Sequence, residues 1–342
     1  MSQNLAAVNP AALAPLEVRP VETPTPGPGD ILIKNHLIAV NPIELSITRR
    51  DLFKSQYPCV IGSSFGGEVI AVGKSVSEFK IGDNVAVWSG LKNGDGYAAY
   101  QAYALAKADT ACLVPEGVDL AVPVSMIGNL ATVVGMISAT AGVTKPDIET
   151  EAAPTGKKIL IYGGTSNMGS LAVQYVRMAG YSVVTTTSPK HRAFVETLGP
   201  DKIINHRQDC EALINALVAE GPYDMVVDTI SRPNTVSLLA SVLAAQGGGI
   251  VFATLPAFGP ESLPEGVVRD FRSWSSMLYS DGNEQWIRWA FHTFFVKGIS
   301  SGKLLPTQIK RIGGGLEAIN FALDTLEKGV SNTKIVVEFD KW

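Results

Sequence analysis

Short apolar runs and helical spacing alternate through the centre of the chain. Residues 159–162 form an apolar run that ends in Gly163-Gly164, which is typical of a buried parallel strand that enters a tight turn. Apolar residues then recur at helical spacing until Gly180, and a second β-branched run covers residues 181–187. The pattern therefore predicts a strand, a glycine turn, a helix and a second strand.

The same alternation continues after this unit. We predict further strands at residues 201–205, 223–230 and 248–255, and further helices at residues 210–220 and 235–245. Strands that alternate with helices at this spacing indicate the α/β class, with a doubly wound parallel sheet.

The N-terminal third has a different pattern. Glycine-punctuated, β-branched runs over residues 1–40 and 59–88 favour a small, strongly bent β-barrel. Residues 96–103 and 111–115 each fit one more strand, whereas Asn-Pro-Ile-Glu at residues 41–44 breaks the strand pattern.

Helical spacing returns in three later stretches, and a last strand closes the chain. The helical stretches are residues 122–141, 285–297 and 316–328, and the strand is residues 334–339. Aromatic residues crowd the stretch 285–297, which predicts either core packing or an interface with a partner protein. The order along the chain is thus a β-rich part, an α/β part and a short return segment.

Composition and charge exclude several classes of protein. The 342 residues suffice for two domains, and the formal net charge of −4 argues against nucleic acids and anionic membranes as main partners. No run reaches the roughly 18–20 uninterrupted apolar residues of a membrane span, and the N-terminus lacks the pattern of a secretory signal. Three isolated cysteines, without C-x-x-C spacing, indicate a reducing compartment and no structural zinc: Cys59, Cys112 and Cys210. We therefore expect a cytoplasmic protein.

The glycine turn carries the first candidate chemistry. Gly164 to Gly169 reads G-x-S-x-x-G, with Ser166 where the usual dinucleotide fingerprint has its middle glycine. A helix N-terminus after such a turn favours a phosphate, and a serine can line a pyrophosphate and add a hydroxyl donor. The alternative is an ordinary βα turn, where glycine serves backbone geometry alone.

The end of the second strand bears on the cofactor. An NAD site would carry an acidic residue about 20 residues after the first glycine, to bind the ribose 2′-hydroxyl. Here the chain reads Thr-Ser-Pro-Lys-His-Arg at residues 187–192, and no acidic residue occurs before Glu196. A hydroxyl and several cations suit a 2′-phosphate and favour NADPH over NADH, although a solvated basic turn has the same composition.

Five stretches of this chain match a known family. They are NPIE at 41–44, GSSFGGEVIAVGKSVSEFKIGDNVAV at 62–87, YGGTSNMGSLAVQ at 162–174, TTTSPK at 185–190 and GGLEAINFALDTLEKGVSNTKIVV at 314–337. On these stretches the chain resembles the medium-chain dehydrogenase/reductase superfamily, in its zinc-free, quinone-reductase-like branch. Within that branch it is most similar to the fungal trans-acting enoyl reductases of secondary-metabolite pathways.

The resemblance implies two domains and a cofactor in the cleft between them. Residues 1–128, completed by residues 300–342, would form a GroES-like β-barrel domain, and residues 129–299 a Rossmann dinucleotide-binding domain. By position, the resemblance implies that NADPH contacts the following residues: Gly164, Thr165, Ser166, Met168 and Gly169 at the pyrophosphate, Ser188 and Lys190 at the 2′-phosphate, His206 near the adenosine ribose, and Asn41, Thr132, Leu255, Ser331 and Lys334 on the nicotinamide side.

The chain departs from the family pattern at several positions. Gly62-Ser63-Ser64 stands where zinc-dependent members have Gly-His-Glu, and the four histidines are scattered, so we expect no catalytic metal. Relatives commonly carry N-P-x-D-x-K, but here Glu44 replaces the aspartate and Ser46 the lysine. Ser64 also stands where many relatives have an aspartate.

The leading hypothesis is an NADPH-dependent, zinc-independent reductase of an activated C=C bond in an enoyl thioester or enone. Its substrate would be a small molecule or carrier-bound, with a polyketide synthase acting in trans as a candidate partner, and the protein would be a monomer or a homodimer. No catalytic proton donor is identified: Tyr57, Tyr97 and His36 are candidates, each with a structural role as the simpler interpretation, and solvent is a further one.

Two alternatives keep the fold. A non-redox lyase, isomerase or cyclase could use Glu44 as an acid or base if burial raises its pKa, although we expect Glu44 to be solvated or ion-paired near Arg49 or Arg50. A synthase-docking partner protein could instead present the cofactor and use the aromatic stretch 285–297 as its interface.

Overall fold

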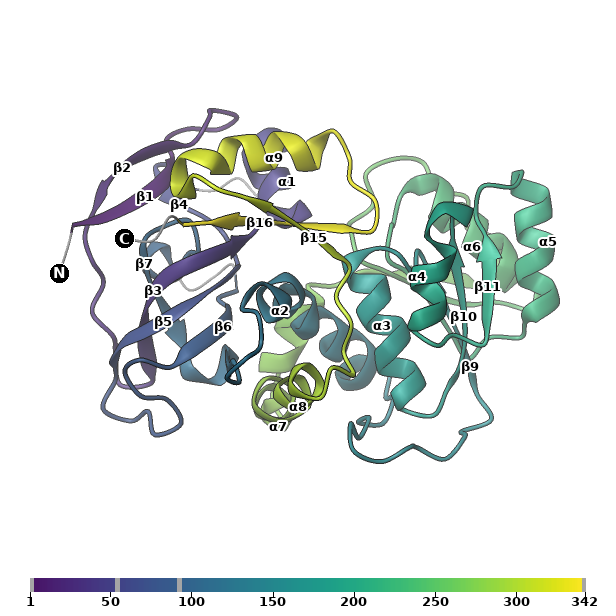
Figure 1. The fold of residues 1–342 in the computed structure, drawn as a ribbon. Coiled ribbons are helices and arrows are strands. Elements are labelled where there is room, and N and C mark those ends of the chain that lie inside the picture. The colour runs from purple at the N-terminus through teal and green to yellow at the C-terminus, as the bar shows by residue number, and fades with distance from the viewer. Residues whose placement is uncertain (1–2, 53–55, 91–93, 340–342) are drawn as a thin grey trace. The chain divides into compact units, whose positions relative to one another are not determined.

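The computed structural model describes residues 3–52, 56–90 and 94–339. Its contacts divide the chain into two compact units. The first unit comprises residues 1–128, 287–302 and 308–342, and the second comprises residues 129–286 and 303–307. Figure 1 follows the chain through both.

The second unit is built on a six-stranded parallel sheet with the order β11-β10-β9-β12-β13-β14. The strands are β9 (Lys158–Tyr162), β10 (Ser182–Thr187), β11 (Lys202–Asn205), β12 (Met225–Asp228), β13 (Gly249–Ala253) and β14 (Val267–Asp270). Every pairing between neighbours is parallel. Because β9 has β10 on one side and β12 on the other, the chain winds outward from β9 in both directions, which confirms the doubly wound α/β class.

Helices accompany the strands of this unit, as Figure 1 shows. They are α3 (Asn167–Met178), η4 (Pro189–His191), α4 (Arg192–Thr197), α5 (Cys210–Glu220), α6 (Pro233–Ala245) and η5 (Trp274–Tyr279), with the π-helical η3 (Val134–Thr140) before β9. Apolar strand residues such as Leu160 and Val226 form one core with helix residues such as Leu217 and Leu239. Burial of these side chains on the faces of the sheet stabilises the layered arrangement.

The first unit contains two sheets. The larger has the order β15-β16-β3-β5-β6-β8, with β7 also paired to β3, and the smaller has the order β2-β1-β4. The strands are β1 (Asn4–Asn9), β2 (Glu17–Val21), β3 (Asp30–Ala39), β4 (Cys59–Val60), β5 (Ser64–Val72), β6 (Asn84–Trp88), β7 (Tyr103–Lys107), β8 (Ala111–Leu113), β15 (Gln308–Ile312) and β16 (Thr333–Glu338).

Bulges and glycines bend the larger sheet. The register of β3 on β5 shifts between Leu32 and Ile33 and again between Asn35 and Leu37. A Cβ on Gly67 would collide with the Lys34 carbonyl, so only glycine fits where these strands cross closely. The expected strongly bent β-rich unit is thereby explained by its glycine spacing.

Helices of the first unit pack on these sheets and on each other. They are α1 (Pro42–Arg50), η1 (Asp95–Tyr97), η2 (Ala108–Thr110), the π-helical η6 (Ala290–Phe294), α8 (Phe295–Ser300), η7 (Gly315–Ala318) and α9 (Ile319–Glu327). Helix α7 (Glu284–Trp289) precedes η6, and the division between the two units falls within it. Within the aromatic stretch, Phe291 is fully buried and its ring stacks on Trp88 at 6.2 Å between centroids. His292 Nε2 lies 3.0 Å from the Ala108 carbonyl oxygen. Core packing accounts for this face of the stretch.

Three local expectations were wrong or incomplete. Residues 98–102 are not a strand: η1 precedes them and β7 begins only at Tyr103. Residues 41–44 do not merely interrupt the strands, because Asn41 caps helix α1 and Pro42 opens it. The sequence pattern also missed β14 and β15, which are short and have at most one buried residue each, and so lack a clear apolar signature.

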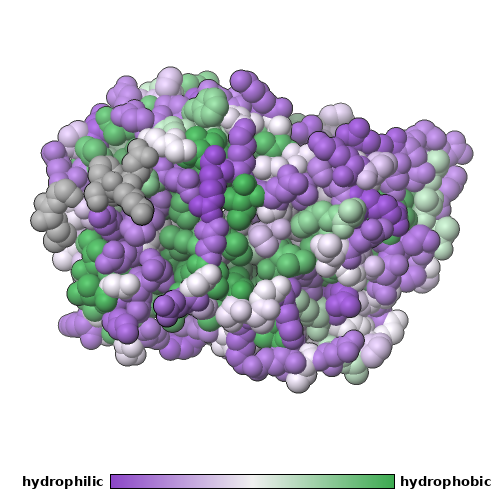
Figure 2. Space-filling model, in the orientation of Figure 1, coloured by the Kyte–Doolittle hydropathy of each residue, from purple (hydrophilic) through white to green (hydrophobic). Residues whose placement is uncertain are grey.

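Within the described parts of the chain, one helical segment is long and apolar enough to cross a membrane. It spans Ala121–Thr140, through α2 (Ala121–Val133) and η3, and 78% of its apolar 18-residue window is buried inside the protein. Figure 2 shows a face on which hydrophilic side chains predominate and hydrophobic ones gather in scattered patches.

Candidate functional site

The turn after β9 is shaped by three glycines. Gly163 has a φ of +89°, and its N–H donates to Thr186 Oγ1 at 2.9 Å, while the N–H of Gly164 donates to the Thr186 carbonyl at 3.0 Å. A Cβ on Gly164 would collide with Thr185 Oγ1, and one on Gly169 would collide with the Gly163 carbonyl. Close packing within the unit therefore requires glycine at both positions. Glycines at these positions of a βα turn are those of a dinucleotide fingerprint.

Ser166 caps the helix that follows this turn. Its Oγ accepts the Gly169 N–H at 2.8 Å and lies 2.8 Å from Thr229 Oγ1. Thr229 Oγ1 already donates to the Tyr162 carbonyl at 2.7 Å, so the shared hydrogen comes from Ser166. Ser166 consequently donates its hydroxyl hydrogen to Thr229. Hydrogen bonds to a pyrophosphate would then come from backbone N–H groups.

The remaining fingerprint residues lie around the start of the twelve-residue helix α3. Thr165 is half-buried and Met168 is buried, one on each side of the Ser166 cap. The positive end of a helix dipole and a glycine turn together suit a diphosphate, so these residues fit the expected group.

The end of β10 is basic. Ser188 is buried and Lys190 is exposed, directly beyond the strand. Burial, followed by the charges of Lys190 and Arg207, lowers the pKa of His191. Burial and the Arg207 charge likewise lower the pKa of His206. The positive charges of Lys190 and Arg207 thus both act on His191, at the end of β10.

Arg207 reaches this place because β11 runs beside β10. Thr187 pairs with Asn205, and the His206 N–H donates to the Thr187 carbonyl at 3.2 Å. The sequence reading named His206 but not its neighbour Arg207. Only the strand order puts residues some 20 positions apart at one sheet edge.

In the first unit, Asn41 and Glu44 form a capping box at the start of α1. Glu44 is fully buried, and its carboxylate accepts the Asn41 N–H at 2.6 Å, the Ser63 N–H at 3.0 Å and the Ser63 hydroxyl at 2.5 Å. The expectation of a solvated Glu44 near Arg49 or Arg50 is wrong, since Arg49 pairs with Asp324 at 2.7 Å. Burial raises the pKa of the Glu44 carboxyl above its usual range.

Lys334, on strand β16, contacts the same buried side chains. We call Asn41, Glu44, Ser63 and Lys334 the Asn41 cluster. The Lys334 side chain is buried, and its ammonium donates to Asn41 Oδ1. Burial lowers the pKa of Lys334 to about 8, against the opposing charge of Glu44. Gly128 lies beside the cluster, because a Cβ there would be 3.3 Å from Asn41 Oδ1.

The other expected nicotinamide-side residues are more dispersed. Leu255 follows β13, and its carbonyl accepts from Arg269, which itself pairs with Glu261 at 3.0 Å. Thr132 is half-buried on α2, in the second unit with Leu255, whereas Ser331 is exposed in the first unit. The structure thus brings Asn41 and Lys334 together in the first unit, to which Ser331 also belongs.

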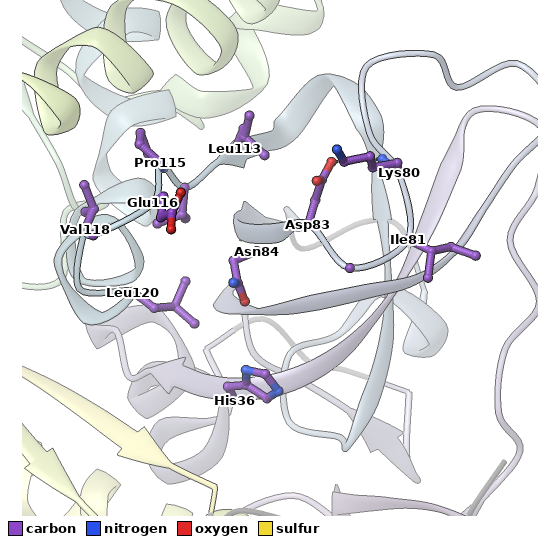
Figure 3. A pocket seen from close by; sticks show the side chains of 13 residues that line it. His36, Lys80, Ile81, Asp83, Asn84, Leu113, Pro115, Glu116, Val118 and Leu120 are labelled. Atoms are coloured by element: carbon purple, nitrogen blue, oxygen red, sulfur yellow. Dashed lines mark hydrogen bonds between the residues drawn. The ribbon is translucent and has the colours of Figure 1, made fainter.

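Two of the three candidate proton donors, Tyr57 and Tyr97, donate hydrogen bonds to carboxylates, and the third, His36, lines a hollow. The Tyr57 hydroxyl donates to Asp51 at 2.8 Å, and the Tyr97 hydroxyl donates to Asp30 at 2.7 Å. His36 lines an open hollow of about 720 Å³ in the first unit. Figure 3 shows this hollow, whose walls include Ile81, Leu113 and Leu120.

None of the expected cofactor residues lines that hollow. Among the residues that the structure describes, no three His, Cys, Asp or Glu side chains lie together as a metal-binding group. The chemistry that the described side chains can perform is therefore concentrated at the glycine turn with its basic neighbour, and at the buried Asn41 cluster.

Two family models match this chain. The alcohol dehydrogenase GroES-like domain matches residues 27–116, and the zinc-binding dehydrogenase model matches residues 168–288.

Similar proteins span nearly the whole chain. Trans-enoyl reductase himH of Aspergillus japonicus is 30% identical, over 98% of this chain and 98% of that protein. Dehydrogenase orsE of Emericella nidulans is 29% identical, over 99% of this chain and 100% of that protein. In fold, the chain is similar to an alcohol dehydrogenase superfamily protein from Novosphingobium aromaticivorans, with a TM-score of 0.76, 20% identity and coverage of 98% of this chain and 100% of that one.

Proposed function

Because the chain belongs to the medium-chain dehydrogenase/reductase superfamily, whose members are oxidoreductases with nicotinamide cofactors, we propose that it reduces an activated C=C bond with NADPH and without zinc. The substrate is an enoyl thioester or an enone of secondary metabolism. The name of the relative himH, a trans-enoyl reductase, supports this substrate class.

The observation that carries the cofactor choice is the basic end of β10. Lys190 and Arg207 both act by charge on His191 there, and Ser188 stands where an NAD-binding protein would have an acidic residue. A 2′-phosphate would accept hydrogen bonds and ion pairs from these groups, whereas a 2′-hydroxyl would leave the cations without an anion.

The chain's own residues bind and orient the reactants. The glycine turn and the α3 N-terminus would hold the pyrophosphate, Ser188 and Lys190 the 2′-phosphate, and His206 the adenosine ribose. Asn41, Thr132, Leu255 and Lys334 are the candidates for the nicotinamide side, with Ser331 as a further one.

When bound, NADPH would supply a hydride for the β-carbon of the substrate. The proton for the α-carbon would come from solvent. The protein contributes orientation and exclusion of water from the reacting atoms.

The proposal extends to partners. A carrier-bound substrate would be delivered by a polyketide synthase acting in trans, in the cytoplasm, to a monomer or homodimer of this chain.

A non-redox enzyme on the same fold is the second candidate, because Glu44 is buried with a raised pKa, as an acid or base requires.

The first experiment measures binding and turnover together. We would titrate the protein with NADPH and NADH by fluorescence, then add α,β-unsaturated thioesters, enones and quinones and follow NADPH absorbance. Lys190→Ala should weaken NADPH binding about tenfold and leave NADH binding unchanged, since one charged hydrogen bond is lost. The matched control is Lys202→Ala, which removes an exposed lysine at the opposite end of β11.

Each outcome has a distinct meaning. A preference for NADH would overturn the cofactor choice. Tight NADPH binding without oxidation by any acceptor class would favour the non-redox candidate instead. No binding of either dinucleotide would contradict the function assigned to residues 163–190.

A further inference from the structure

A fully buried carboxylate ends strand β12 beside the glycine turn. Asp228 is 0% exposed, and it pairs in register with Tyr162, the last residue of β9. The glycine turn begins at the next residue, Gly163. A buried carboxylate costs free energy unless donors surround it, so the hydrogen bonds of Asp228 indicate its role.

Three donors from the segment after β12 bind this carboxylate. Its Oδ1 accepts the N–H of Ile230 at 2.9 Å and the N–H of Ser231 at 2.8 Å, and its Oδ2 accepts the Thr235 hydroxyl at 2.6 Å. Because the carboxylate is shielded from water, these bonds are stronger than they would be on the surface. Both oxygens of Asp228 therefore hold the connection between β12 and α6.

Ser231 has a strained backbone conformation in this connection. Its φ is +52° and the residue has no exposure, whereas residues other than glycine rarely adopt such an angle. Its hydroxyl donates to the Asp228 carbonyl at 2.6 Å and accepts the Thr254 N–H at 2.6 Å. Such a conformation persists only where surrounding contacts enforce it, and Asp228 supplies two of these contacts.

The same connection lies against the glycine turn. The Thr229 hydroxyl donates to the Tyr162 carbonyl at 2.7 Å and lies 2.8 Å from Ser166 Oγ. A Cβ on Gly163 would lie 2.7 Å from Thr229 Oγ1 and 3.0 Å from Ile230 Cδ1. Thr229 and Ile230 thus contact the glycine turn at its start and at the cap of the helix that follows it.

Capping of helix α6 accounts for only part of these contacts. Thr235 Oγ1 accepts the Arg232 N–H at 3.0 Å and links Asp228 to the first turn of α6. The bonds from Ile230 and Ser231 to Asp228 lie before the helix and involve none of its N–H groups. They determine instead the backbone of the residues that contact the glycine turn.

We propose that Asp228 is a positioning residue for the pyrophosphate of the dinucleotide, because it holds Thr229 and Ile230 against the turn that starts at Gly163. This inference rests on the proposed function, which assigns the pyrophosphate to that turn. Asp228 acts through the connection 229–231 and needs no contact with the dinucleotide itself. All of these residues belong to the second unit.

The test compares three variants in this region with one control. Asp228→Ala removes both acceptor oxygens, whereas Asp228→Asn keeps an acceptor for the two backbone N–H groups and gains an amide N–H for the nearby hydroxyl. Thr229→Val removes the hydroxyl that joins the connection to Ser166. The control is Asp224→Ala, which removes a carboxylate that accepts the Lys158 N–H at 2.8 Å, at the opposite end of β9 and β12.

The readout is the ratio of affinities for 2′-phospho-ADP-ribose and for adenosine 2′-monophosphate. Only the first ligand carries the pyrophosphate, and neither carries the nicotinamide. We expect Asp228→Ala and Thr229→Val to lower this ratio about tenfold, as lost pre-organisation does, and Asp228→Asn and Asp224→Ala to keep it near the wild-type value. In the first two variants the KM for NADPH should rise, while kcat at saturating NADPH is retained.

A purely structural role of Asp228 would give different results. Equal weakening of both ligands in Asp228→Ala would overturn the inference, as would an unchanged ratio in the folded variant. A ratio as low in Asp228→Asn as in Asp228→Ala would also overturn it, because the asparagine retains the bonds that position the connection. If Asp228→Ala does not fold, Thr229→Val decides, and an unchanged ratio in that variant would overturn the inference.

Two results with the wild type separate this inference from the proposed function. Binding of both ligands without oxidation of NADPH by any acceptor would count against the reductase alone and leave the positioning role standing. Failure to bind 2′-phospho-ADP-ribose would overturn the assignment of the pyrophosphate to the glycine turn, and this inference with it.

Discussion

The hydroxyl groups of Ser166 and Thr229 lie 2.8 Å apart, and this contact joins the turn after β9 to the turn after β12. These strands are neighbours in the sheet, and the chain winds away from them in opposite directions. Ligands of doubly wound sheets bind at such a switch point, beyond the carboxyl ends of the strands. The Ser166–Thr229 contact therefore braces the turn that we assign to the pyrophosphate.

Ser166→Ala should destabilise the protein by about 1 kcal/mol, because helix α3 loses its N-cap. NADPH affinity should fall as well, since the turn loses its tie to Thr229. Urea unfolding and fluorescence titration would measure the two effects. Ser166→Thr, which keeps the capping oxygen, is the control, and a stable Ser166→Ala protein with unaltered affinity would contradict the bracing role.

Gly164→Ala should be destabilising by about 1–3 kcal/mol, because the added methyl group must displace the Thr185 side chain, whose hydroxyl donates to the Ile161 carbonyl at 2.7 Å. Thermal unfolding of the single variant, and of the double variant with Thr185→Ala, would check this steric cause. The double variant should recover part of the loss. Gly29→Ala, where a Cβ meets nothing within 4 Å, should change little.

Arg207→Ala should raise the pKa of both His191 and His206, because a nearby positive charge is removed. NMR titration of the histidine ring protons would measure this. NADPH affinity should fall several-fold and NADH affinity should not. Arg192→Ala is the comparison, since Arg192 pairs with Glu196 at 2.9 Å; equal effects of the two variants would refute a specific role for Arg207.

Lys334 should make stability rise with pH in the alkaline range. Its pKa is about 8 in the folded protein and 10.5 in an exposed lysine, so between these values the unfolded chain binds more protons. The free energy of unfolding should therefore increase from pH 8 toward pH 10.5, by about 3 kcal/mol at most. Urea titrations of the wild type and of the neutral Glu44→Gln, Lys334→Met variant would isolate this contribution, and parallel curves would disprove it.

The parallel half of the fold could be predicted from the sequence because its strands are buried on both faces. Residues 159–162 and 181–187 match β9 and β10 to within a residue, since continuous apolar runs have no other stable location. Helix α1 was missed because Asn41-Pro42 was interpreted as a turn. The sequence did hold a signal for the helix, since an Asn N-cap with Pro at the first helical position and Glu three residues after the cap marks a helix start.

The candidate site likewise has residues that could be predicted from the sequence and residues that could not. The glycine turn and Ser188-Pro-Lys190 are contiguous in sequence, so local spacing was enough to single them out. Arg207, Thr229 and Arg269 come from other strands and carry no local signal. The burial of Glu44 was also hidden, because an isolated Glu followed by two arginines is most often a solvated residue.

By itself the sequence determined the elements whose signal is local: glycine turns, helical spacing, buried strands and the basic end of β10. Tertiary structure alone decided that Lys334 meets Asn41, 293 positions earlier in the chain, and that Glu44, which accepts a hydrogen bond from the Asn41 amide nitrogen, is fully buried. The physical reason is that hydrogen-bond geometry and desolvation depend on which distant segments the sheet brings together. A charged residue such as Glu44 can be buried only when folding supplies its hydrogen-bond partners.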